Sequence, residues 1–201
     1  MTATDSIFDA SDPFQLTRDW MADAERTEPN DPNAIALSTV DADGMPNVRI
    51  VLLKEIADDA FVFYTNYGSQ KGVELGHSGK AAFVLHWKTT RRQVRVRGLV
   101  SRQDDARADA YFASRDLGSR LGAWASRQSH PLEDRETLEA RIEQARERFG
   151  EDPPRPPHWG GFRIRPIEFE FWADGKHRLH DREKWVKPEH LVRWTAQRLF
   201  P

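Results

Sequence analysis

The chain has 201 residues, with 30 Lys and Arg against 32 Asp and Glu, so its formal net charge is only −2. This balance gives no electrostatic reason to expect nucleic acid or an acidic membrane as a partner. The sequence has no cysteine, which excludes thiol catalysis, thiolate metal sites and disulfides. It also has neither a long apolar run nor a signal peptide, so we expect no membrane span and a cytoplasmic location.

The N-terminal part predicts a tail and then a helix. Residues 1–12 are polar and are expected to be mobile. Asp12 and Pro13 are typical of an N-cap and a first helical residue, and apolar residues at helical spacing predict an amphipathic helix over 13–27. Ser69 is the expected cap of a short helix over 69–77. Between and after these helices, β-branched and aromatic runs predict strands over 34–40, 49–54, 60–66, 80–88 and 92–103.

The C-terminal half returns to strands after a helical middle. Helices are expected over 104–114, 119–127 and 133–149, and strands over 160–172 and 177–184. Turn signals recur about every ten residues, which favours an antiparallel barrel over βαβ units. Because the strands on both sides of the helical middle are expected to share one sheet, we predict a single domain over 13–201 of the α+β class, mainly β.

Common nucleotide and hydrolase motifs are absent, since no strand is followed by a G-x-G-x-x-G, P-loop or G-x-S-x-G sequence. In the predicted strand 177–184, Arg178, His180 and Arg182 alternate and are expected to project from one face. Such a cluster suits an anionic ligand, although a solvated sheet face is the simpler interpretation. His177 and His180 would then point to opposite faces, so we expect no metal site.

Two further cationic sets are candidates. Arg49 and Lys54 flank a four-residue apolar run that is typical of a buried strand, unless both ends simply emerge into solvent. Tyr111 and Arg115 are spaced four apart on a predicted helix, and Ser119 follows just beyond Gly118. A phenol, a guanidinium and a hydroxyl on one side form a plausible phosphate site, although a core Tyr with a surface Arg is the commoner arrangement.

Eight motifs in register resemble the pyridoxine/pyridoxamine 5′-phosphate oxidase family, from about Asp12 to the chain end. They are RIVLLK (49–54), FYTN (63–66), SQKG (69–72), RQVRVRG (92–98), YFASR (111–115), GAWASRQS (122–129), WGGFR (159–163) and FWADGKHRLHDR (171–182). The resemblance implies an antiparallel FMN-binding split β-barrel with peripheral helices, assembled as a homodimer with FMN at the interface.

The resemblance also implies the site residues. The substrate phosphate would be held by Lys54, Tyr111, Arg115 and Ser119, and the catalytic residues Arg178 and His180 would lie over the pyridine ring. The FMN-contacting residues would be Arg49, Ile50, Val51, Leu52, Leu53, Lys54, Tyr64, Thr65, Gln70, Lys71, Gln93, Gln128, Ser129, Trp172 and Arg182. The family usually has arginine at Gln70, and the segment 183–194 is longer and more polar than its usual counterpart, with Pro188 arguing against a continuous strand.

The implied reaction is FMN-dependent oxidation of pyridoxamine or pyridoxine 5′-phosphate to pyridoxal 5′-phosphate, with O2 reduced to H2O2. A related oxidase of the phenazine-pathway type would keep FMN but lack the full phosphate site. A non-catalytic flavin- or haem-binding split barrel would bind its cofactor without turnover. A nucleic-acid-binding barrel is disfavoured by the near-neutral charge.

Overall fold

The computed structural model describes residues 7–187 and 193–201. Over these residues the chain forms an α+β fold of eight strands, five α-helices and one 3₁₀ turn. In chain order the elements are α1 (Pro13–Thr27), β1 (Ala34–Val40), β2 (Pro46–Ile56), β3 (Phe61–Asn66), α2 (Gln70–Ser78), β4 (Lys80–Trp87), β5 (Arg92–Arg102), α3 (Asp105–Ala113), α4 (Leu117–Ala125), α5 (Arg135–Phe149), β6 (Trp159–Ala173), η1 (Lys176–Arg178), β7 (Asp181–Val186) and β8 (Thr195–Leu199).

The sheet is a closed antiparallel barrel with a two-strand extension, which confirms the predicted architecture. Its strand order is β3-β2-β1-β4-β5-β6-β7-β8, and a further pairing of β3 with β6 closes the first six strands. Strand β6 has 15 residues and pairs with β5 along most of its length. Its N-terminal part also pairs with β3 and its C-terminal part with β7. One strand therefore links the barrel to the extension.

Aromatic side chains fill the barrel, and α1 closes one end of it. Asp12 caps α1 by accepting a hydrogen bond from the Gln15 backbone N–H, as predicted. Phe14 of α1 stacks on Phe61 with ring centroids 5.4 Å apart, and Phe61 meets Phe83 edge-on at 5.0 Å. Burial of each such ring contributes about 1.5–3 kcal/mol, so the helix is an integral part of the core.

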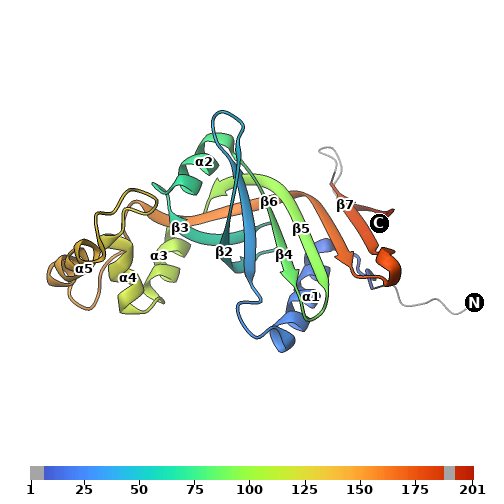
Figure 1. Cartoon of the computed structure of the whole chain (residues 1–201), viewed down its shortest axis with the longest axis horizontal. Coiled ribbons are helices and arrows are strands. Elements are labelled where there is room, and N and C mark those ends of the chain that lie inside the picture. Colours follow the sequence, from blue (N-terminus) through green and yellow to red (C-terminus); the bar gives the residue numbers. More distant parts are fainter. Residues whose placement is uncertain (1–6, 188–192) are drawn as a thin grey trace, which may run out of the picture.

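Three of the remaining helices cluster at one end of the molecule. Figure 1 shows α3, α4 and α5 on the opposite side of the barrel from β7 and the C-terminus. Helix α5 buries only Ala145, so it is a solvated surface helix. On β5, Val94 and Val96 are buried while Arg95 is exposed, which is the alternation of a strand with one face on the core. The barrel thus presents two distant ends where different residues gather.

One predicted strand is wrong. Residues 177–184 do not form a continuous strand, because His177 and Arg178 have φ angles of 56° and 65° and lie in the 3₁₀ turn η1. The backbone N–H of Leu179 closes this turn by donating to the carbonyl of Lys176 at 3.1 Å. Strand β7 begins only at Asp181. Arg178, His180 and Arg182 therefore do not share one strand face.

Two smaller expectations also differ from the structure. Helix α4 starts at Leu117, two residues before the predicted start, because Asp116 caps it by accepting from the Ser119 backbone N–H at 2.8 Å. Strand β2 is longer than predicted and is not a buried strand: Val48 and Ile50 are 64% and 65% exposed. The apolar run does lie on a strand, but one of its faces is uncovered in the single chain.

Two other expectations concern segments near the ends of the chain. Phe8, within the segment expected to be mobile, is 3% exposed and lies 5.9 Å from the Trp20 ring. Pro188 lies outside the described residues, and β7 ends before it at Val186. In residues 7–187 and 193–201, no helix is long and apolar enough to cross a membrane.

Candidate active site

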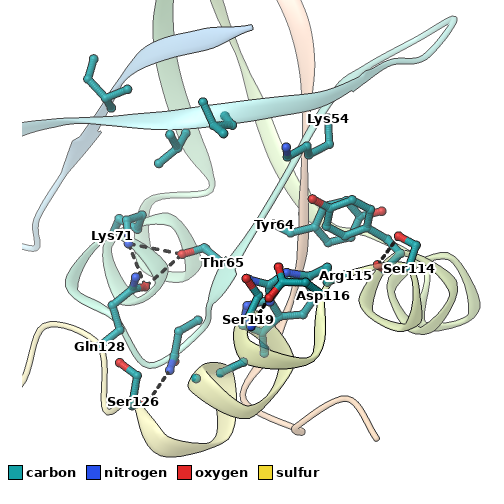
Figure 2. Close-up of a pocket in the computed structure, with 18 residues that line it drawn as sticks. Lys54, Tyr64, Thr65, Lys71, Ser114, Arg115, Asp116, Ser119, Ser126 and Gln128 are labelled. Carbon is teal, nitrogen blue, oxygen red and sulfur yellow. Dashed lines mark hydrogen bonds between the residues drawn. The ribbon is translucent and has the colours of Figure 1, made fainter. Parts of the chain in front are cut away.

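A cavity of about 780 Å³ lies between the barrel and the helical end of the molecule. Strands β2 and β3 form one wall and helices α2, α3 and α4 the other (Figure 2). Four residues predicted to hold a phosphate, Lys54, Tyr111, Arg115 and Ser119, all line it. The structure therefore brings together side chains that lie 65 positions apart in sequence, from Lys54 to Ser119.

Arg115 brings to this cavity a buried nitrogen that the described protein groups do not satisfy. It follows the end of α3 rather than lying within that helix, because Ser114 is the C-cap. Its Nη1 atom is buried and has no hydrogen-bond partner within the described chain. Burial lowers the pKa of Arg115 from its ordinary value, and the neighbouring Tyr111 and Asp116 only partly oppose this. A buried guanidinium nitrogen without an acceptor favours an anion from outside the chain.

A second cation, Lys71, lies across the cavity in the first turn of α2. Its Nζ donates to Thr65 Oγ1 at 3.2 Å and to Gln128 Oε1 at 3.0 Å (Figure 2). It also donates to Ser69 Oγ at 3.2 Å. Burial, and secondarily the charge of Arg49, lower the pKa of Lys71. Helix N-termini also favour anions. Lys71 and its hydroxyl neighbours thus place a positive charge and polar groups on the wall of this cavity.

Stacked aromatic rings also line this cavity. Tyr64 and Tyr111 stack with centroids 4.1 Å apart, and Trp159 lies 5.6 Å from Tyr64 at an interplanar angle of 10°. Trp159 was missed as a site residue, although the quoted WGGFR motif contains it. A Cβ on Gly161 would lie only 2.9 Å from the Tyr64 ring. The two glycines that follow Trp159 in the sequence therefore indicate that aromatic rings pack closely against the backbone here.

Other predicted cofactor residues divide between this cavity and its surroundings. Those that line it are Ile50, Val51, Leu52, Lys54, Tyr64, Thr65, Lys71 and Gln128. Leu53 points into the core at 3% exposure. Gln70 and Ser129 instead line a separate hollow of about 540 Å³ beside Asp41 and Glu74.

Arg49 is held by the protein itself. Its Nη2 lies 3.1 Å from Glu74 Oε2, its Nη1 donates to the Leu37 carbonyl at 3.3 Å, and Thr39 Oγ1 is also within hydrogen-bond distance. Glu74 is only 4% exposed. Burial alone would raise the pKa of Glu74, but hydrogen bonds from Thr39 and Asn47 and the charge of Arg49 together lower it. This network joins α2 to β1 and β2.

The remaining predicted residues gather at the far end of the sheet. Gln93, Trp172 and Arg182 are direct neighbours across β5, β6 and β7. Arg178 and His180 line a cavity of about 590 Å³ with Arg91 and Asp174. None of these five predicted residues lines the cavity that contains Arg115.

The 174–180 turn fixes the orientation of His180. The Gly175 backbone N–H donates to His180 Nδ1 at 3.2 Å, and the ring lies 4.6 Å from that of Trp172. Asp174 Oδ1 is 3.3 Å from the same nitrogen, and Arg91 binds the other carboxylate oxygen at 2.5 Å. A Cβ on Gly175 would lie 1.9 Å from the Leu179 carbonyl oxygen, so this close turn requires glycine.

Two family models match consecutive parts of the chain. The model described as pyridoxamine 5′-phosphate oxidase matches residues 21–149, and that of the pyridoxine 5′-phosphate oxidase C-terminal dimerisation region matches residues 159–201. The chain belongs to the pyridoxamine 5′-phosphate oxidase family. Members named pyridoxine/pyridoxamine 5′-phosphate oxidase from Cereibacter sphaeroides and Roseobacter denitrificans are 64% and 59% identical, over 97% and 100% of this chain and 98% and 100% of theirs.

Solved structures of the family share the same barrel. PhzG from Burkholderia lata 383, in complex with tetrahydrophenazine-1-carboxylic acid, has a TM-score of 0.89 at 32% identity, covering 96% of this chain and 95% of that one. A pyridoxamine 5′-phosphate oxidase-related, FMN-binding protein from Nostoc punctiforme has a TM-score of 0.76 at 16% identity, over 96% and 100% of the two chains. The predicted family and fold class are thus confirmed.

Proposed function

We propose that the protein oxidises pyridoxamine 5′-phosphate or pyridoxine 5′-phosphate to pyridoxal 5′-phosphate, with FMN as cofactor and O2 reduced to H2O2. The observation that carries this proposal is the buried, unpartnered Nη1 of Arg115 in the cavity shared with Lys54, Tyr111 and Ser119. A phosphate dianion offers several acceptor oxygens to these donors. The family relationship supports a substrate of this class.

The described residues also fit FMN. The Lys71, Thr65 and Gln128 cluster supplies a cation and polar groups near a helix N-terminus, which suits the phosphate of a flavin mononucleotide. The apolar side chains of Ile50, Val51 and Leu52 line the same cavity and suit a flat ring system. When bound, the flavin would supply the hydride-accepting chemistry, while the protein supplies binding, orientation and charge.

The two clusters suggest a site shared between two copies of the chain. Arg115 and Lys71 lie at one end, whereas Arg178, His180 and Trp172 lie at the other. The uncovered apolar side chains of Val48 and Ile50, together with the match to a dimerisation region, support a homodimer. In this arrangement one protomer anchors the substrate phosphate and the other presents Arg178 and His180 to its reacting end.

Each protein group then has a defined role. Lys54, Tyr111, Arg115 and Ser119 hold the phosphate and restrict the substrate to one pose, which lowers the entropic cost of reaction. Arg178 orients the pyridine ring. The Nδ1 atom of His180 accepts from the Gly175 N–H, so the neutral ring carries its proton on Nε2 and would donate a hydrogen bond from there to the reacting end of the substrate. A cytoplasmic location would match the absence of cysteine.

The decisive experiment compares peroxide release from pyridoxamine 5′-phosphate with that from unphosphorylated pyridoxamine. We expect turnover of the phosphorylated substrate and little of the other. Chromatography of the flavin released on denaturation should show FMN and no FAD. Activity on a reduced phenazine carboxylate without activity on either B6 phosphate would instead indicate the PhzG type, and flavin binding without any turnover would indicate a sensor.

A further inference from the structure

Arg115 is held differently from several other partly buried arginines of the chain, which are paired with carboxylates. They include Arg49 with Glu74, Arg155 with Asp105 and Asp109, Arg163 with Asp59, and Arg182 with Glu170. Within the described residues Arg115 forms no ion pair, and its neighbour Asp116 is engaged in capping α4. Something other than a counter-charge must therefore fix its guanidinium.

The group that lies against Arg115 is the ring of Trp159. The Cζ atom of Arg115 is 4.9 Å from the centroid of that ring and 5.9 Å from the centroid of Phe112. Both distances are within the range of a cation–π interaction, for which tryptophan is the strongest partner. Trp159 also lines the cavity that contains Lys54, Tyr111 and Ser119.

Trp159 is itself rigidly held. It is 7% exposed, and Phe112 meets it edge-on with centroids 5.1 Å apart. Its backbone carbonyl accepts from Arg155 Nη1 at 2.8 Å, and its N–H donates to the Pro156 carbonyl at 3.0 Å. The ring is therefore a fixed platform at the start of β6.

An aromatic platform has a different effect on a cation than a carboxylate does. A carboxylate would neutralise the guanidinium charge and occupy two of its in-plane N–H donors. The face of an indole attracts the charge through its quadrupole but leaves those N–H donors free. The guanidinium is then positioned while its charge and hydrogen bonds stay available to an incoming anion.

We propose that Trp159 is a positioning residue for substrate recognition, which holds the Arg115 guanidinium by its ring face and thereby sets the affinity for the phosphate group. This inference rests on the proposed function, in which Arg115 binds the substrate phosphate. Trp159 acts through Arg115 and takes no part in the chemical step, so its effect belongs to substrate binding rather than to turnover.

The test is a double-mutant cycle on the FMN-loaded enzyme with pyridoxine 5′-phosphate. We expect Trp159→Leu to raise KM about tenfold with kcat nearly unchanged. In the Arg115→Ala background the same change should have almost no effect on KM, because there is no guanidinium left to position. Equal effects in both backgrounds would show that Trp159 is merely a packing residue and would overturn the proposal.

Two variants control for folding. Trp124 also carries an arginine over its ring, with Arg148 Cζ at 5.7 Å, but it does not line the cavity. Trp124→Leu should therefore lower thermal stability without changing KM. If Trp159→Leu does not yield folded protein, the cycle is repeated with Trp159→Phe, which keeps a smaller aromatic face and should raise KM about threefold.

The outcomes separate this inference from the proposed function. Wild-type protein that does not distinguish phosphorylated from unphosphorylated substrate would contradict the proposed function. Wild-type protein that does distinguish them, with a KM unaffected by Trp159→Leu, would leave the proposed function intact and contradict the role of Trp159.

Discussion

At the scale of single residues, neighbours in sequence face different surroundings. Lys71 lies in the cavity and donates to three acceptors, whereas Gln70 is exposed and lines the separate hollow beside Glu74. The pair is consequently a matched test of which side chain binds the flavin phosphate.

We predict that Lys71→Met raises the dissociation constant of FMN by roughly 10- to 100-fold, since charge-assisted hydrogen bonds contribute about 1.5–3 kcal/mol. Gln70→Ala should raise it by about threefold or less, because a neutral amide contributes less. Titration of the apo-protein with FMN, followed by fluorescence quenching, gives both values. A larger effect at Gln70 than at Lys71 would place the phosphate in the other hollow.

The same residue predicts a pH dependence. The pKa of Lys71 is lowered by burial and by Arg49, so its charge is lost at a lower pH than that of an ordinary lysine. FMN affinity should therefore decline as the pH rises through this lowered value. The decline should be absent from Lys71→Met, and an unchanged decline in that variant would assign the effect to another group.

At the scale of elements, most helices and strands could be predicted from the sequence, whereas strand β8 and one turn could not. Asp12 and Ser69 carry their capping signals locally, so α1 and α2 begin where expected. The 177–184 segment also alternates like a strand. Its turn depends on contacts of Gly175 with Leu179 and His180, which periodicity does not reveal.

The candidate site residues also divide into those that could be predicted from the sequence and those that could not. Lys54, Tyr111, Arg115 and Ser119 line one cavity, as the family resemblance implies. The i,i+4 spacing placed Tyr111 and Arg115 on one helix, but Arg115 lies beyond the end of α3. The position of Trp159 over Arg115 depends on the pairing of β3 with β6. Pairing between strands so far apart in the chain is set by the whole fold, so no local pattern indicated it.

Glu74 connects three elements, and its removal should show what that connection contributes. We predict that Glu74→Ala destabilises the protein by about 3 kcal/mol, because it leaves Arg49 partly buried without its partner. Denaturant unfolding provides the measurement. Glu143→Ala is the control: its contact with Arg146 on α5 is exposed, so its loss should change stability by less than about 0.5 kcal/mol.

The sign of the pH effect follows from the lowered pKa of Glu74. Its contribution is complete above the ordinary pKa of a glutamate and is lost as the pH falls through the lowered folded value. The stability difference between wild type and Glu74→Gln should therefore shrink in acid. A difference that grows as the pH falls would contradict this assignment.

At the scale of the whole molecule, the separation of the two residue clusters makes complementation the sharpest test. We predict that the variants Arg115→Ala and Arg178→Ala each have low activity at low substrate concentration. Activity should be regained when the two dimers are dissociated, mixed and reassociated. Random pairing gives about half heterodimers, each with one intact site, hence about one quarter of wild-type activity. Mixing Arg115→Ala with itself is the control. No recovery would place both residues in a site within one chain.

The closure of the barrel by β6 has a consequence for how the protein is made. Asn66 at the end of β3 pairs with Trp159, and all of α3, α4 and α5 lies between them in the chain. During synthesis β3 and β5 therefore emerge long before β6, and until then their edges are unpaired. Such an edge can pair with other chains, and closure must wait for a long loop to be traversed. The last strand of the barrel to leave the ribosome is thus the one that completes both its wall and the Trp159 platform.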